Sequence, residues 1–99
     1  MTHRIQFAEA ARTDIERLYR FIADQDIPAA DAALRALDKG WEMLRSFPFS
    51  ARRVDVANPF LREMLIPFGN AGYVALFEID DDTTLTVLAV RHQREDDYH

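Results

Sequence analysis

The second half of the sequence contains the side chains that could cleave a phosphodiester without a metal ion. Arginines could stabilise the oxyanion of the transition state, and a histidine or a tyrosine could move protons. The residues of these types near the ends of the predicted strands are Arg62, Tyr73, Arg91, His92, Arg94 and Tyr98. On a curled antiparallel sheet they could converge. By themselves, however, these residues favour a structural interpretation, in which the arginines pair with nearby glutamates and His92 lies at the end of the sheet.

Other kinds of catalytic or metal-binding site find little support in the sequence. The absence of cysteine excludes disulfides, thiol catalysis and cysteine-based metal sites. The histidines, His3, His92 and His99, lack the spacing of metal ligands, and the sequence has no glycine-rich phosphate loop. Asp80, Asp81 and Asp82 are consecutive, which favours a solvated hairpin tip over a calcium loop. We therefore expect no metal and no cofactor.

The length and charge of the chain narrow its function further. Its 99 residues predict one domain, spanning residues 1–99. Twelve basic and seventeen acidic residues give a net charge of −5, which opposes sequence-independent binding of nucleic acid. No apolar run is long enough to span a membrane, and the first residues lack the apolar core of a signal peptide. We therefore expect a cytoplasmic protein.

The first half of the sequence predicts a short strand followed by two helices. Residues 4–7 alternate as in a strand, and a helix is expected from about residue 8 to residue 23. The apolar residues of this helix recur every three or four positions: Ala8, Ala11, Ile15, Leu18 and Ile22. A second helix over residues 28–47 ends at Pro48, and Gly40 within it indicates close approach of the two helices. The short connection between the helices predicts an antiparallel hairpin.

The second half of the sequence predicts strands. After a loop over residues 49–59, strands are expected at residues 60–66, 73–79 and 84–92. The predicted fold is therefore α+β, with the order β-α-α-β-β-β. In it, an N-terminal strand and a helical hairpin pack on one face of a small antiparallel sheet.

The last two strands are apolar on both faces, which predicts a protein partner. The final strand would place Leu85, Val87 and Ala89 on one face, and Leu88 and Val90 on the other. Strands of this kind are normally covered on both sides, yet one pair of helices can cover only one. We therefore expect the second face to bind another polypeptide, with a homodimer as the alternative.

Several segments resemble the RelE/ParE toxin superfamily. Residues 7–23 resemble its opening strand and helix, residues 28–48 its second helix, and Leu61-Arg62-Glu63-Met64 its Leu-Arg-Glu-Leu strand. Residues 73–77 and 85–94 resemble its last two strands. The resemblance implies the toxin of a plasmid- or chromosome-borne type II toxin–antitoxin pair. It also implies an antitoxin that wraps the toxin and binds the promoter DNA.

The resemblance leaves three functions open. A ParE-like member would inhibit DNA gyrase by protein contact and would not be an enzyme. A RelE-like member would be an endoribonuclease that cuts messenger RNA on the ribosome. A non-toxic member would act only as a binding module or co-repressor. The net charge and the single lysine, Lys39, oppose docking on a ribosome, and residues 90–94 look more like a ParE strand ending, so the ParE-like function is preferred.

Site residues can be predicted for each function. The residues expected to contact the target are Arg62, Arg91, His92 and Arg94, supported by the tail at residues 95–99. The residues expected to act in a nuclease are Arg62, Arg91, His92 and Tyr98. The residues expected to contact the antitoxin are Leu18, Tyr19, Trp41 and Leu76, although Trp41 suits the core equally well.

Overall fold

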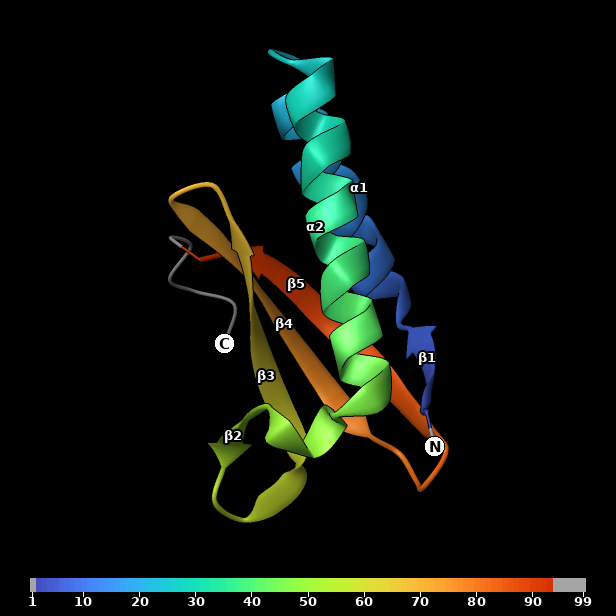
Figure 1. The fold of residues 1–99 in the computed structure, drawn as a ribbon. Helices are drawn as coiled ribbons and strands as arrows, with labels where there is room; N and C mark the ends of the chain where they lie inside the picture. Colours follow the sequence, from blue (N-terminus) through green and yellow to red (C-terminus); the bar gives the residue numbers. More distant parts are fainter. Residues whose placement is uncertain (1, 94–99) are drawn as a thin grey trace.

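A computed structural model describes residues 2–93 of the chain, and its element order confirms the predicted α+β fold (Figure 1). The elements are β1 (Arg4–Phe7), α1 (Glu9–Ala23), α2 (Ile27–Ser46), the 3-10 turn η1 (Pro48–Ser50), β2 (Arg52–Asp55), β3 (Asn58–Phe68), β4 (Ala71–Ile79) and β5 (Thr84–His92). Among these residues no helix is both long and apolar enough to cross a membrane.

The sheet has five strands in the order β1-β5-β4-β3-β2, and it is mixed. β1 runs parallel to β5, whereas the other neighbours are antiparallel. The predicted all-antiparallel sheet is corrected at this edge. Both helices and three strands separate β1 from β5 along the chain, so no tight turn between the two strands requires them to be antiparallel. The predicted loop over residues 49–59 is also corrected, because it contains η1 and β2. All four residues of β2 are exposed, so the sequence shows no alternation there.

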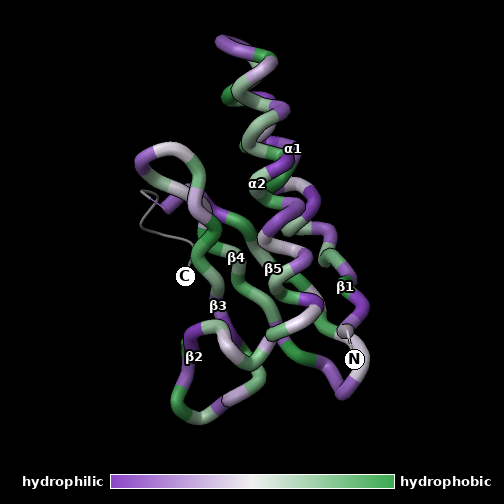
Figure 2. The backbone as a smooth tube through the Cα atoms, in the orientation of Figure 1, coloured by the Kyte–Doolittle hydropathy of each residue, from purple (hydrophilic) through white to green (hydrophobic). Residues whose placement is uncertain are grey.

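Both helices pack on the same face of the sheet and form the core there (Figure 1). Leu18 of α1 and Leu37, Trp41 and Leu44 of α2 meet the inward side chains of β4 and β5, among them Phe77. The hydropathy of the backbone follows this arrangement, because the middle of β4 is hydrophobic (Figure 2). The end of the helical hairpin projects beyond the sheet (Figure 1). The predicted antiparallel hairpin is thus present, with its α2 N-terminus capped by Asp26, which accepts from the Ala29 N–H at 3.1 Å.

A β-bulge at Leu88 changes which residues of β5 face the helices. Leu76 pairs with Ala89 while Phe77 pairs with Val87, so one residue of β5 is left over. Val87 and Val90 are therefore both fully buried on the helix side. The prediction that Ala89 shares a face with Val87, and Val90 with Leu88, is wrong because strict alternation does not anticipate the extra residue.

The face away from the helices is less apolar than the sequence suggests. By alternation it carries Leu65, Val74, Leu76 and Ala89 at its centre, and charged or polar residues around them. Neither helix covers this face in the part of the chain that the structure describes (Figure 1). This uncovered apolar centre agrees with the prediction that one face of the sheet is left open. It is, however, a narrow apolar strip and does not extend over the whole face.

Gly40 packs α2 against the sheet and not against α1. A Cβ atom at this position would lie 2.7 Å from Ile66 Cδ1 and 3.3 Å from Met64 Cε, both in β3. The prediction that Gly40 serves helix–helix approach is therefore wrong. The glycine instead allows the helix backbone to come close to a strand side chain.

Asp81 organises the β4–β5 turn, as expected for a hairpin tip. Its Oδ1 accepts hydrogen bonds from the backbone N–H and the hydroxyl of both Thr83 and Thr84, at 2.8 to 3.0 Å. Donation by the Thr83 backbone and by the threonine hydroxyls lowers the pKa of Asp81 to about 2 from 3.8.

Removing the charge of Asp81 is expected to flatten the acid dependence of stability. A carboxyl whose pKa is depressed on folding contributes stability above its unfolded pKa, and that contribution is lost as the pH falls toward the folded pKa. The melting temperature of the wild type should therefore fall more steeply between about pH 4 and about pH 2 than that of Asp81→Asn. Thermal melts followed by circular dichroism measure this. Asp82→Asn, which removes a charge from the same turn but none of these bonds, should retain the wild-type slope. Equal slopes for wild type and Asp81→Asn would contradict the assignment.

Candidate functional site

The structure does not bring Arg62, Arg91 and His92 together. Arg62 pairs across β4 with Phe77, and His92 pairs with Tyr73, so both face the helix side. They lie on opposite sides of β4 and four residues apart along it, about 13 Å. Arg91 pairs with Val74 in the sheet, and its guanidinium is held by Asp14 of α1. One phosphodiester therefore cannot contact all three side chains. Arg94 and Tyr98, with the tail at residues 95–99, lie outside the described residues.

Arg62 orders the segment that joins α2 to β3. Its Nη1 donates to the carbonyl oxygens of Phe49 and Ala51 at 3.0 and 2.9 Å, and its Nε donates to that of Pro59 at 2.8 Å. Its guanidinium carbon also lies 5.3 Å from the centre of the Phe49 ring. Within residues 2–93 these contacts hold Arg62 in place through backbone carbonyls, which do not neutralise its positive charge.

Arg91 belongs to a buried polar contact between α1 and β5. Asp14 of α1 accepts a hydrogen bond from the Val90 N–H at 2.9 Å and forms an ion pair with the Arg91 guanidinium. Asp14 is 8% exposed. Its carboxylate thus fills the position of a neighbouring strand, because β1 ends before it reaches this part of β5.

Asp14 was not among the residues predicted from the sequence. It lies three positions after Ala11 and four before Leu18, on the buried stripe of α1. An acidic side chain on such a stripe must find a partner, because a buried unpaired charge is costly. This spacing was the signal that could have identified it.

His92 lies at the rim of an apolar cleft between α1 and the β3–β4 turn. The cleft has a volume of about 590 Å³, and its apolar lining includes Leu18, Phe21, Phe68 and Tyr73. The rings of Phe68 and Tyr73 stack with centroids 6.0 Å apart, and His92 meets Tyr73 edge to face at 5.7 Å. Burial raises the pKa of Tyr73, so its hydroxyl stays protonated at neutral pH. The apolar walls of the cleft are therefore suited to an apolar group.

The four residues expected to contact an antitoxin lie in four different surroundings. Leu18 lines the cleft just described, whereas Trp41 is 8% exposed and meets Phe7 edge to face in the core. Tyr19 lies on the outer side of the helical hairpin, where its hydroxyl donates to Asp31 at 3.2 Å. The neighbouring Asp31 carboxylate raises the pKa of Tyr19. Leu76 faces away from both helices, half-buried.

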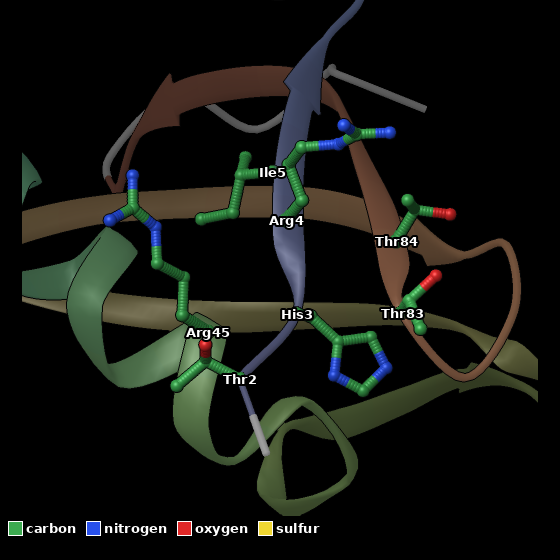
Figure 3. Close-up of a pocket in the computed structure, with 7 residues that line it drawn as sticks. All are labelled: Thr2, His3, Arg4, Ile5, Arg45, Thr83 and Thr84. Atoms are coloured by element: carbon green, nitrogen blue, oxygen red, sulfur yellow. The ribbon is translucent and has the colours of Figure 1, made fainter.

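A second hollow lies beside β1 and is more polar (Figure 3). Arg4, Arg45 and His3 are among its lining residues, which suggests an anion site at first sight. The two guanidinium groups point to opposite sides of β1, away from each other (Figure 3). Because they do not converge, the hollow does not offer the forked grip that binds a phosphate.

Residues 5–97 match the family described as the ParE toxin of the type II toxin–antitoxin system, parDE. The chain belongs to the ParE toxin family. It is thus a toxin of the type II toxin–antitoxin class, within the superfamily that the sequence resembles. No curated protein sequence matches it significantly.

Two solved structures share the fold of this ParE-family chain. One is the chromosomal ParDE system from P. aeruginosa, with 13% identity and a TM-score of 0.71, covering 92% of this chain and 96% of that one. The other is the toxin–antitoxin complex RelBE2 from Mycobacterium tuberculosis, with 21% identity and a TM-score of 0.61, covering 93% and 99%. The fold is therefore common to both branches of the superfamily, and the fold alone does not separate their activities.

Proposed function

We propose that this ParE-family toxin inhibits DNA gyrase by protein contact in the cytoplasm, needs no cofactor and is neutralised by a cognate antitoxin. The observation that supports inhibition by contact is the separation of Arg62, Arg91 and His92. A contact inhibitor can spread its binding residues over a surface, whereas a nuclease must aim its acid, base and oxyanion-stabilising groups at one phosphate.

The alternative function is ribosome-dependent cleavage of messenger RNA. It would require Arg62, Arg91, His92 and Tyr98 around one scissile bond. The contacts of Arg62 with three carbonyls and of Arg91 with Asp14 oppose that arrangement, and so does a net charge of −5 near ribosomal RNA. A third function, as a non-toxic co-repressor, would require neither activity.

An antitoxin partner is supported by the apolar surface that the described residues leave exposed. Leu65 on the face away from the helices is 48% exposed, and Phe21 beside the cleft is 72% exposed. Both solved relatives come from toxin–antitoxin systems. We propose that the antitoxin covers the cleft around Leu18 and Phe21 and reaches the strip around Leu76.

Purified toxin is expected to block supercoiling by gyrase and to leave messenger RNA intact. One assay measures conversion of relaxed to supercoiled plasmid by gyrase, with and without toxin. A second measures cleavage of a messenger RNA on purified ribosomes. Toxin preincubated with its antitoxin, encoded by the adjacent reading frame, serves as the matched control and should be inactive. Codon-specific RNA cleavage with normal supercoiling would establish the RelE-like alternative, and inactivity in both assays would establish the non-toxic one.

A further inference from the structure

Exposed apolar side chains are concentrated in the segment that leads from the end of α2 through η1 and β2 into β3. Nine large hydrophobic side chains are exposed in the described residues, and six of them fall between residues 43 and 60. These six are Met43, Phe47, Phe49, Val54, Val56 and Phe60. We name residues 43–62 the aromatic lobe; it contains the last turn of α2, η1, β2 and the start of β3 (Figure 1). A concentration of this kind marks an interaction surface.

The aromatic lobe is basic, in contrast to the rest of the chain. It contains four arginines and one aspartate, which give it a net charge of +3. Because the whole chain carries −5, the remaining residues together carry −8. Arg52 forms an ion pair with Glu63, whereas within the described part of the chain Arg53 and Arg62 donate their hydrogen bonds to carbonyl oxygens, which do not cancel a charge. An acidic partner would therefore be attracted to this end of the molecule and repelled by the rest.

The aromatic lobe is held in shape before any partner arrives. Arg62 ties η1 to β3 through its three carbonyl contacts, and the Phe49 and Phe60 rings meet edge to face with centroids 6.3 Å apart. At the β2–β3 turn, Arg53 donates to the Val56 carbonyl at 2.8 Å and the Asp55 carboxylate accepts from the Ala57 N–H at 2.9 Å. These bonds fix the turn that presents Val56, which is 91% exposed. Preordering of this kind reduces the entropy that binding must cost.

We infer that the aromatic lobe is the surface by which the toxin grips its protein target, and that the matching site on the target is acidic with apolar side chains inside it. Val56 and the Phe49–Phe60 pair would enter the apolar part, and Arg53 and Arg62 would face the acidic part. This inference rests on the proposed function, in which the target is gyrase, and it adds which surface makes the contact. It also changes the expected role of Arg62, which positions Phe49 as well as contributing charge.

A protein surface suits the aromatic lobe better than single-stranded nucleic acid does. Val54, Val56 and Met43 are aliphatic and cannot stack on bases, whereas stacking on aromatic faces provides much of the binding to single strands. One side of the Phe49 ring is also occupied by the Arg62 guanidinium. Binding of single-stranded nucleic acid is therefore the competing outcome of the test.

The test compares two lobe variants with matched variants elsewhere on the chain. Val56→Glu and Arg53→Glu change the lobe. Ile27→Glu, at a 60% exposed position on the projecting end of the helical hairpin, and Arg35→Glu, at an exposed position of α2, make matching changes to a β-branched residue and an arginine outside it. Circular dichroism and thermal melting of each full-length variant show that it is folded. The probes are purified gyrase holoenzyme and a fluorescent 20-nucleotide single-stranded RNA.

Each lobe variant is expected to weaken inhibition of supercoiling about tenfold, while each control stays within about twofold of the wild type. Inhibition by folded Val56→Glu and Arg53→Glu at wild-type strength would overturn the inference while leaving gyrase as the target. RNA binding by the wild type that Val56→Glu abolishes, with inhibition unchanged, would also overturn it in favour of nucleic acid.

If the wild-type chain does not inhibit gyrase, the proposed function is wrong. The inference about the aromatic lobe is then tested by measuring growth arrest in cells. In that case the same variants are expressed without antitoxin. Loss of arrest with the lobe variants alone supports the lobe as the target surface of another protein. Arrest by all variants, or by none including the wild type, overturns the inference.

Discussion

Gly72→Ala is expected to lower the free energy of unfolding by about 3 kcal/mol, and the melting temperature by about 12–24 °C. A Cβ atom on Gly72 would lie 2.4 Å from the Ile66 carbonyl oxygen and 3.2 Å from Pro67 Cα. Both are backbone atoms of the paired strand β3, so no side-chain rotation relieves the clash. The two strands must separate, which breaks pairing at the end of the sheet where Phe68 and Tyr73 form the cleft.

Gly69→Ala is the matched control for this effect. Gly69 has a φ of 62°, and a Cβ atom there would meet nothing within 4 Å. Its cost is only that of placing alanine in the left-handed region, about 1 kcal/mol. Chemical denaturation of the two variants measures the difference. A loss for Gly72→Ala equal to or smaller than that for Gly69→Ala would show that β3 and β4 approach each other less closely than described.

Asp14→Ala is expected to cost about 2–3 kcal/mol of stability. The substitution leaves the Val90 N–H without its acceptor at the edge of β5, and it leaves the largely buried Arg91 guanidinium without its carboxylate. Asp14→Asn retains an acceptor for Val90 and should lose less. Both free energies are obtained from urea unfolding, with the slope of each transition compared to confirm that the folded states are alike.

The exposed ion pair between Glu16 and Arg20 provides the control for Asp14. Its side chains are 59% and 73% exposed, so Glu16→Ala is expected to change stability by less than about 1 kcal/mol. In a double-mutant cycle, Asp14→Ala and Arg91→Ala together should cost less than the sum of the two alone. Additive losses would mean that the pair does not couple α1 to β5.

The contact between Asp14 and Arg91 affects how any loss of toxicity is interpreted. Arg91 remains a predicted target residue, but its replacement also removes a structural ion pair. Toxicity of Arg91→Ala is therefore informative only where the variant is shown to be folded. Asp14→Asn, which disturbs the same pair from the side of α1, separates the two effects. If it preserves toxicity while Arg91→Ala abolishes it, the guanidinium itself matters for the target.

The sequence determined the order of the elements and most of the core. The recurrence of apolar residues every three or four positions in α1 and α2, and the alternation along β4, are local patterns that report directly which side of each element is buried. Leu18, Leu37, Leu44 and Phe77 are accordingly buried in the core. Pro48 also marked the end of α2 to within two residues.

Only the tertiary structure decided how those elements combine at the site. The bulge at Leu88, the parallel pairing of β1 with β5 and the short strand β2 depend on which strands meet, and no local period encodes this. The same strand pairing places Arg62, Arg91 and His92 in three different surroundings. From the sequence alone, these residues could have converged at one site. The physical reason is that alternation along one strand is a local property of the sequence. Which strands pair, and in which register, depends on contacts between residues far apart in the chain.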